Sequence, residues 1–260
     1  MTSGSLEPFF RPEDVWKGRQ NIIYNEMFSI LVSFLSSNSG LKRFETARCL
    51  LFNIIAAILF TDELLAEEIV IGAFSNSDLS GWEQKEFKGT TSYSLTEVQG
   101  LMVLRAQSAD SASALVREKR VNLSEFPYLN WNWRVELKLD SKNERRKSGD
   151  DYAARIYVIF DAGIFPWQLK AVNYVWASQM EKGEIWENAI AGKNAMMIAL
   201  RNHEDSTSIW LSEKRNIKND LKEMFGFEVD WIDGVAIMTD TDNSGGLAKT
   251  YYGDIFFSTQ

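Results

Sequence analysis

Residues 128–139 read YLNWNWRVELKL, and their apolar side chains alternate with polar ones. Successive side chains of a β-strand point to opposite faces of the sheet, so this alternation predicts a strand with one buried face. The apolar face is expected in the core and carries Trp131, Trp133, Val135 and Leu137. The opposite face is polar and carries Asn130, Asn132, Arg134 and Glu136.

Short apolar or alternating runs of this kind recur from residue 69 to the end of the chain. Eleven of them, separated by polar turns, fall within fewer than 200 residues. Strands that alternate with helices would need helical patterns of roughly 10–15 residues between the runs, and the chain offers one such pattern. The sequence therefore predicts an all-β sandwich or barrel that forms a single domain over residues 67–260.

The one helical pattern lies in residues 215–228, RNIKNDLKEMFGFE. Its apolar residues recur at helical spacing and are Ile217, Leu221, Met224 and Phe225. Asn216 can cap the start of this helix, and Gly226 can end it. We expect one short helix across the end of the sandwich.

Residue counts exclude several classes of function. The chain has 28 Lys and Arg against 36 Asp and Glu, a formal net charge of −8, which disfavours binding to nucleic acid. A single Cys (Cys49) and a single His (His203) exclude disulfide bonds, Cys-based zinc sites and His clusters. The glycine-rich phosphate loops and the common hydrolase motifs are also missing. We therefore expect no cofactor and no nucleic-acid partner.

Residues 41–68 read LKRFETARCLLFNIIAAILFTDELLAEE and have the order of a secretory signal peptide. A basic segment precedes twelve mostly apolar residues from Cys49 to Phe60, and a short polar stretch follows. The apolar run is shorter than the roughly 20 residues that a membrane span needs. We expect residues 1–66 to be a leader cleaved near Glu67, with a periplasmic or secreted mature chain that has no membrane span. A buried helix of a cytoplasmic domain and an uncleaved anchor are the alternatives.

Candidate binding residues gather where residues 145–160, RRKSGDDYAARIYVIF, pass from a basic turn into an apolar strand. Strand parity places Arg155 and Tyr157 on the face that points away from the core. The buried face is expected to carry Ala154, Ile156, Val158 and Phe160. If this strand forms a hairpin with the strand quoted first, Glu136 shares the polar face and is the expected partner of the Arg155 guanidinium. Asp151 is expected at the rim of the ligand groove.

Three further residues complete the predicted binding site. Trp176 can offer its ring to a sugar if the strand AVNYVWAS turns that side outward; otherwise the ring belongs to the core. Arg215 lies beside the start of the helix, and its planar guanidinium suits hydroxyls or a carboxylate. A structural ion pair with Asp220 or Asp151 is the alternative for Arg215. Asn216, the residue after Arg215 in the same motif, is the third of these predicted binding residues.

Paired carboxylates would support a hydrolase in place of a binding protein. Glycoside hydrolysis needs two of them, about 5–5.5 Å apart for retention or 6.5–9.5 Å for inversion. The candidates are Glu136, Asp151, Glu213 and Asp240. The stretch DTDNSG, residues 240–245, also begins like a calcium loop, but Tyr251 stands where an EF-hand needs Glu. A hairpin turn is favoured there, with a calcium site of a jelly roll as the alternative.

Seven motifs in order carry a resemblance to a known family, over about residues 70–258. They are FSNSDLSGWEQKEFKGTTSYSL, SADSASALV, LNWNWRVE, GDDYAARIYVIF, NYVWAS, WLSEKRNIKNDLKEMFG and AIMTDTDNSGGLAKTYYGDIFF. Together they resemble the bacterial domain-of-unknown-function family numbered 3047, which implies no established activity. The first motif and the closing YYGDIFF also resemble, more loosely, the galactose-binding-like jelly rolls of carbohydrate-binding modules. These resemblances imply a jelly-roll-like β-sandwich.

The expected function is that of an exported protein that binds a glycan or other small polyhydroxylated ligand at a polar, aromatic sheet face. A carbohydrate-active hydrolase with paired carboxylates and a periplasmic structural or interaction scaffold are the alternatives. The exposure of the predicted site residues discriminates among these three functions. An open groove favours binding, facing carboxylates favour an enzyme, and a buried network of mutually bonded side chains favours a scaffold.

Overall fold

The computed structural model describes residues 67–140, 143–161 and 169–260. Its strands are β1 (Glu68–Gly72), β2 (Trp82–Lys88), β3 (Ser92–Val98), β4 (Leu101–Ala109), β5 (Ala112–Asn122), β6 (Tyr128–Leu137), β7 (Arg155–Asp161), β8 (Leu169–Trp176), β9 (Ile185–Asn188), β10 (Gly192–Arg201), β11 (Leu211–Asn216), β12 (Trp231–Met238) and β13 (Leu247–Ser258). The helical elements are the 3-10 turns η1 (Phe74–Asn76) and η2 (Lys147–Gly149) and the helix α3 (Ile217–Phe225).

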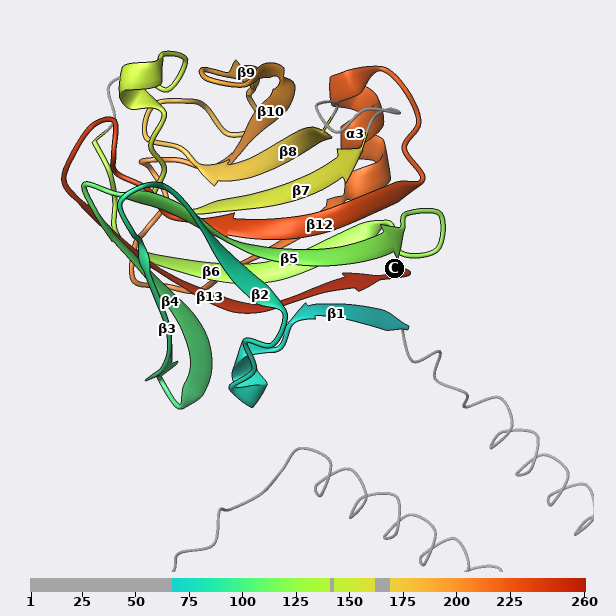
Figure 1. Ribbon diagram of the computed structural model, residues 1–260, viewed down its shortest axis with the longest axis horizontal. Coiled ribbons are helices and arrows are strands. Elements are labelled where there is room, and N and C mark those ends of the chain that lie inside the picture. Colours follow the sequence, from blue (N-terminus) through green and yellow to red (C-terminus); the bar gives the residue numbers. More distant parts are fainter. Residues whose placement is uncertain (1–66, 141–142, 162–168) are drawn as a thin grey trace, which may run out of the picture. The chain divides into compact units, whose positions relative to one another are not determined.

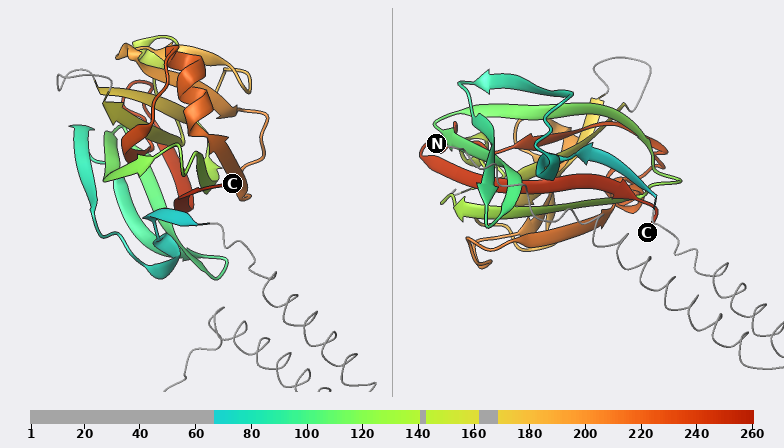
Figure 2. Two further views of the ribbon diagram at one scale, coloured as in Figure 1. Left: turned by 90° about the vertical axis from the view of Figure 1, so that its right-hand side faces the viewer. Right: turned by 90° about the horizontal axis from the view of Figure 1, so that it is seen from below.

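The strands form two sheets, which are stacked on each other in Figures 1 and 2. The first sheet has the order β11-β6-β13-β4-β3, with β1 also paired to β13. The second sheet has the order β2-β5-β12-β7-β8-β10-β9. Neighbouring strands run antiparallel except β8 and β10, which are parallel. The described residues thus confirm the predicted all-β, jelly-roll-like sandwich with one short helix.

The core lies between the two sheets and contains the predicted apolar faces. Trp131 and Trp133 of β6 are buried and meet Tyr174 and Trp176 of β8, with ring centroids 5.4 and 6.1 Å apart. The core face of β7 is confirmed as well, because Ile156, Val158 and Phe160 are fully buried. Leu137 is an exception, since it is the last residue of β6 and is 47% exposed.

The predicted hairpin between β6 and β7 is wrong, because the two strands belong to different sheets. Their apolar faces point toward each other across the core, so their polar faces point in opposite directions. Glu136 therefore lies on the outer face of the first sheet, and Arg155 lies on the outer face of the second. The segment between the strands crosses from one sheet to the other.

Helix α3 covers the far end of β7 and β8, in agreement with the sequence. Asn216 caps it by accepting a hydrogen bond from the backbone N of Asn219 at 3.0 Å, and Gly226 ends it in the left-handed conformation. Phe225 of the helix packs edge-on against Phe160 of β7, with ring centroids 5.2 Å apart.

The predicted leader, residues 1–66, lies outside the described residues, so export and cleavage stay predictions. Contacts divide the chain into two units, Met1–Leu65 and Ala66–Gln260, and the described strands all belong to the second. Within the described ranges, no helix has both the length and the hydropathy required to cross a membrane.

Candidate functional site

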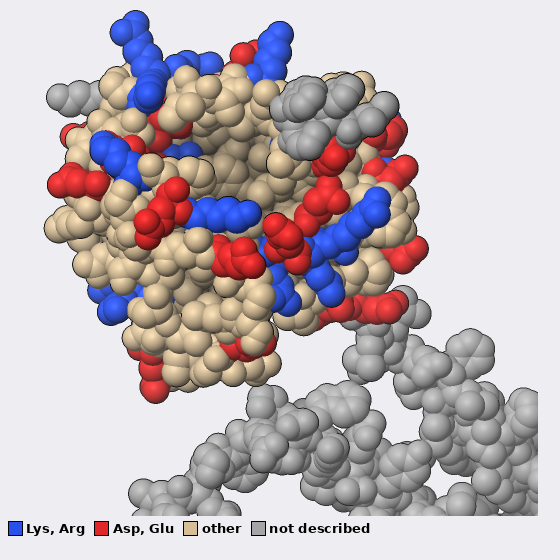
Figure 3. Space-filling model, in the orientation of Figure 1, with Lys and Arg blue, Asp and Glu red and all other residues tan. Residues whose placement is uncertain are grey.

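Strand β7 turns Arg155 and Tyr157 toward a pocket of about 330 Å³ on the outer face of the second sheet. The polar residues that line it are Asp150, Arg155, Tyr157, Asn188, Asp240, Asp242 and Asn243. The apolar ones are Phe87, Ala112, Ile190, Ala191, Ala195 and Met238. Figure 3 shows that the face turned to the viewer is hollowed near its centre, with acidic and basic side chains around the hollow.

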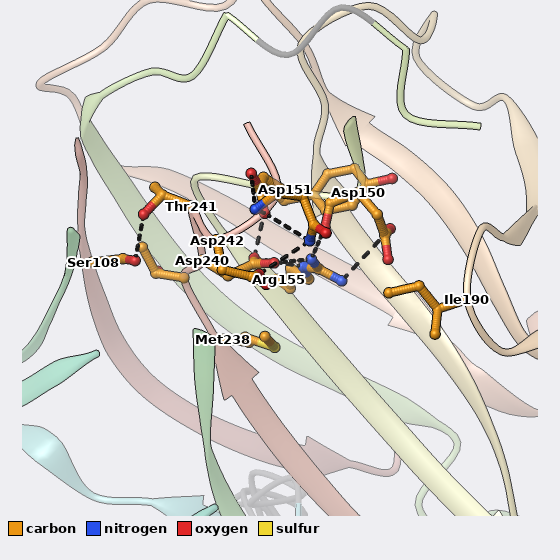
Figure 4. Close-up of polar contacts among 12 residues, drawn as sticks. Ser108, Asp150, Asp151, Arg155, Ile190, Met238, Asp240, Thr241 and Asp242 are labelled. Carbon is orange, nitrogen blue, oxygen red and sulfur yellow. Dashed lines mark hydrogen bonds and ion pairs between the residues drawn. The ribbon is translucent and has the colours of Figure 1, made fainter. Parts of the chain in front are cut away.

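Arg155 forms the floor of this pocket and is 3% exposed. Its guanidinium makes two hydrogen bonds to the Asp240 carboxylate, one of them from Nε to Oδ1 at 2.9 Å. Nη2 also donates to the backbone oxygen of Asp150 at 2.7 Å, and Nη1 donates to the Tyr157 hydroxyl at 2.9 Å. Figure 4 shows Arg155 between Asp240 and Asp150. The predicted partner Glu136 is therefore wrong, and Asp240 takes that place.

Two tyrosines from β7 and from the segment before it enclose the guanidinium. The ring of Tyr152 lies 4.4 Å from the Arg155 Cζ, a cation–π contact in a buried environment. Burial raises the pKa of Tyr157 to about 12, although Arg155 opposes the shift. The Tyr157 hydroxyl is therefore neutral at ordinary pH and can donate as well as accept a hydrogen bond.

Carboxylates outnumber cations around the pocket. Burial and the neighbouring charges of Asp151 and Asp150 raise the pKa of Asp240 to about 7, although Arg155 opposes the shift. Burial also raises the pKa of Asp150, and burial with the Asp151 charge raises that of Asp242. Each shift makes the neutral form of a carboxyl easier to reach, because burial disfavours the charged form and the single buried arginine does not offset this effect.

Asp151 holds the turn that follows β12 and does not lie at the rim of the pocket. Its carboxylate is fully buried and accepts hydrogen bonds from the backbone N of Asn243, at 3.1 Å to Oδ2, and from the backbone N and the Oγ of Ser244. Residues 240–245 form a turn, since Gly245 N donates to Thr241 O at 2.9 Å, but the predicted hairpin is wrong because β12 and β13 belong to different sheets. Asp151 thus connects the two sequence motifs that flank the pocket.

Asp151, Asp240 and Asp242 form an acidic cluster in which each residue places one oxygen within 4.8 Å of the others. The oxygens of Asp151 accept bonds from the turn, and those of Asp240 accept bonds from Arg155. A calcium ion requires six to eight oxygens free to face it. The cluster is therefore not an open set of metal ligands.

The other residues predicted for the site lie elsewhere and have structural partners. Trp176 is 2% exposed and packs on Trp133 in the core, so its ring does not reach an open face. The Arg215 guanidinium pairs with both oxygens of Asp220, at 2.9 and 2.6 Å. Asn216 caps α3. Only Arg155 and Tyr157 of the predicted set line the pocket.

The remaining predicted carboxylates are also paired away from the pocket. Glu136 accepts a hydrogen bond from Ser208 Oγ at 2.8 Å and forms an ion pair with Arg134. Glu213 accepts from Arg201 Nε at 2.6 Å and from Trp133 Nε1 at 3.0 Å. Asp240 is therefore the one predicted carboxylate that lines the pocket.

Sequence reasoning missed several pocket residues because they come from distant strands. Phe87 is contributed by β2 and Asn188 by the end of β9. The Asn188 amide donates to both oxygens of Asp150 at 3.0 Å, which fixes the wall of the pocket. The order of the strands in the sheet brings these residues together, and no local pattern in the sequence predicts that order.

A second pocket, of about 380 Å³, lies on the first sheet. It is formed by β6, β11 and β13 and is lined by Asn130, Trp131, Asn132, Ser212, Glu213, Lys214, Asp254 and Phe256. Asn130 donates a hydrogen bond to Ser258 Oγ at 2.9 Å, and Asp254 accepts one from the backbone N of Ser75 at 2.8 Å. Of the residues predicted for a site it contains only Glu213, a candidate carboxylate that is paired with Arg201.

The fold and the pocket together define a two-sheet β-sandwich protein with a concave, acidic site on one outer face. The chain belongs to the family described as "Protein of unknown function (DUF3047)", whose sequence model matches residues 80–256. This match confirms the resemblance seen in the sequence motifs. A search of curated proteins found no match.

Several solved structures are similar in part. The chain is similar to a glycoside hydrolase domain of Endo-D from Streptococcus pneumoniae R6 (8% identity, TM-score 0.36), over 69% of this chain and 22% of that one. It is also similar to a cellulase derived from Rhodothermus marinus (8%, TM-score 0.41; 74% and 99% covered). A third is the xyloglucanase domain of a type three effector from Sinorhizobium fredii, solved with cellobiose (12%, TM-score 0.40; 74% and 97% covered). The chain spans about a fifth of the first of these proteins, and similarity at these scores carries no argument about activity.

Proposed function

We propose that the chain is an exported protein that binds a glycan or another neutral, polyhydroxylated ligand in the pocket on the second sheet. The proposal rests on the residues of this chain. The pocket presents carboxylate and amide oxygens from the half-buried residues Asp242 and Asn243, which accept hydrogen bonds from hydroxyl groups. A pocket that combines apolar walls with a few polar groups is typical of small-molecule sites.

The charge of the pocket favours a neutral ligand over an anionic one. Asp150, Asp240 and Asp242 line it together with the single cation Arg155. Arg155 already donates to Asp240, Asp150 and Tyr157, so its guanidinium is not free to bind a phosphate, sulfate or carboxylate. Like charges close together repel, and the repulsion is stronger where the dielectric constant is low.

Two exposed apolar side chains at the pocket are the observation that carries the proposal. Phe87 is 68% exposed and Ile190 is 61% exposed, although both are large and apolar. They come from β2 and from the turn after β9, on separate elements that border the same pocket. Apolar side chains that border a polar-floored pocket suit a ligand with C–H faces as well as hydroxyls, which describes a sugar.

Each alternative function has one observation in its favour. A hydrolase is favoured by the pKa of about 7 for Asp240, which suits a general acid. Both Asp240 oxygens are however bonded to Arg155, and the side chain is 1% exposed, so it has no free position toward a substrate. A scaffold is favoured by the bonded Arg155 network, but such a network does not explain exposed Phe87 and Ile190.

A glycan array with the full chain tests the proposal. We expect wild type to bind neutral oligosaccharides, and Phe87→Ala to bind them at least about tenfold more weakly because an apolar contact is lost. Leu101→Ala is the matched control, since Leu101 is 58% exposed in β4 of the other sheet. Analysis of the bound oligosaccharide for cleavage separates binding from hydrolysis. A wild-type chain that binds no glycan would refute the proposal and favour the scaffold.

A further inference from the structure

The side chain of Asn173 is fully buried, and neither its amide nitrogen nor its amide oxygen has a hydrogen-bond partner among the described residues. Buried polar atoms are paired in the great majority of cases, so an amide with both ends unpaired requires an explanation. Leaving such a group without partners typically destabilises the folded state. Val175, two residues further along the same face of β8, is fully buried in an apolar cluster, so this face accommodates apolar residues.

Asn173 lies on the pocket side of the second sheet. In the antiparallel pair β7–β8 it is directly opposite Tyr157, and residues directly opposite each other share a face. Tyr157 lines the pocket. On its other side, in β10, Asn173 is paired with Met197. The Asn188 amide, another lining group, lies 3.6 Å from the Met197 sulfur.

The side chains beside Asn173 separate it from the pocket, and a ligand reaches it only if they move. Met197 is fully buried at this position, and methionine is unbranched with three rotatable bonds, so it can adopt other conformations at low cost. The neutral hydroxyl of Tyr157 accepts a hydrogen bond from Arg155 and donates one to the sulfur of Met238 at 3.4 Å. The amide of Asn173 thus lies between Tyr157, which lines the pocket, and Met197, which is buried beside the lining residue Asn188.

We propose that Asn173 is a specificity-determining residue of the pocket and binds two neighbouring hydroxyls of a neutral sugar. The inference rests on the proposed function. An amide presents a donor and an acceptor next to each other, and hydroxyl groups both donate and accept, so a pair of hydroxyls satisfies both ends at once. The amide carries no charge, in keeping with an acidic pocket that disfavours anionic sugars. A site that needs a ligand hydroxyl discriminates strongly against an analogue that lacks it.

The test compares stability and binding for Asn173→Leu in the full chain. Leucine has nearly the same size and removes the unpaired amide, so we expect the melting temperature without ligand to rise by about 2–4 °C. Binding to the neutral oligosaccharides of the array should fall by about tenfold or more. Asn202→Leu is the matched control, because Asn202 is equally buried but accepts from Glu204 N at 3.1 Å. Its melting temperature should fall.

Each outcome is decisive. A lower melting temperature or failure to fold for Asn173→Leu would show that its amide is structural and would overturn the inference. Unchanged binding by Asn173→Leu would overturn it too, while loss of binding by Phe87→Ala would leave the proposed function intact. Absence of binding by wild type to every neutral oligosaccharide would remove the proposed function and this inference together.

Discussion

Arg155 and Asp240 form a buried ion pair with two hydrogen bonds, which joins the start of β7 to the turn after β12. Their side chains are 4% and 1% exposed. Removing one partner of such a pair leaves an uncompensated charge in the interior. The pair therefore supports the fold at the same place where it forms the floor of the pocket.

Arg155→Ala should lower the free energy of unfolding by about 3–5 kcal/mol, because Asp240 is left buried without its cation. Urea unfolding above pH 7, where Asp240 is ionised in the folded wild type, measures this change. Arg145→Ala is the control, since its ion pair with Glu184 is 52% and 36% exposed and should contribute about 1 kcal/mol or less. A loss for Arg155→Ala that is no larger than the loss for Arg145→Ala would contradict the assignment of a buried pair.

Stability should depend on pH through Asp240. Its pKa in the folded chain is about 7, above the ordinary value of 3.8, so between these values the folded state holds a proton that the unfolded state has released. The stabilising contribution is complete below the ordinary pKa and is lost as the pH rises through 7, at up to about 1.4 kcal/mol per pH unit. Wild type should therefore lose stability relative to Asp240→Asn as the pH rises, as measured by urea unfolding. If the free energy of unfolding of wild type instead rises relative to that of Asp240→Asn over this range, the pKa of Asp240 is lowered in the folded chain.

Asp151→Ala should destabilise the turn after β12. The substitution leaves the backbone N–H groups of Asn243 and Ser244 without their acceptor, at a cost of about 1–3 kcal/mol in all, because Asn243 is half-buried and water can reach Ser244. Hydrogen exchange of these two amides should accelerate before the rest of the sheet is affected. Ser244→Ala removes the hydroxyl bond alone and should have a smaller effect. Equal exchange rates in wild type and Asp151→Ala would mean that the turn is held by other contacts.

Alternation in the sequence predicts the strands and their buried faces well, because a period of two depends only on neighbouring residues. The tryptophans of β6 and the apolar face of β7 are both where the pattern places them. Which strand pairs with which depends on the path of the chain between sheets, and no local pattern records that path. The error about Glu136 follows from this, since β6 and β7 are adjacent in sequence but belong to opposite sheets.

The candidate site could be predicted only in its local parts. Parity places Arg155 and Tyr157 on an outer face, and the stretch around Asp240 has the composition of a turn. Their contact depends on β12 lying beside β7, with Met238 opposite Arg155. Trp176 lies in the core, which was the alternative to its place at the binding site, and the sequence cannot decide between the two because either face of an apolar strand can be buried when both sides of a sheet are covered.

Export is tested at the N-terminus of the protein purified from its native host. The order of basic and apolar segments before Glu67 predicts that the mature chain begins within a few residues of that position. N-terminal sequencing gives the answer directly. A chain that retains Met1 would refute the cleavage and remove the argument for a periplasmic or secreted location.

Asn216→Ala should lower the free energy of unfolding by about 1 kcal/mol, because Asn216 Oδ1 accepts the hydrogen bond from Asn219 N that caps α3. Helix α3 packs against Phe160, near the opposite end of β7 from Arg155, so five residues or roughly 17 Å of strand separate it from the pocket. Glycan binding by the folded variant should therefore equal that of wild type. Asn216→Asp keeps a capping oxygen and should melt within a degree or so of wild type, since aspartate caps about as well. If Asn216→Ala melts normally but no longer binds, the residue contacts the ligand, and the pocket on the second sheet is not the whole site.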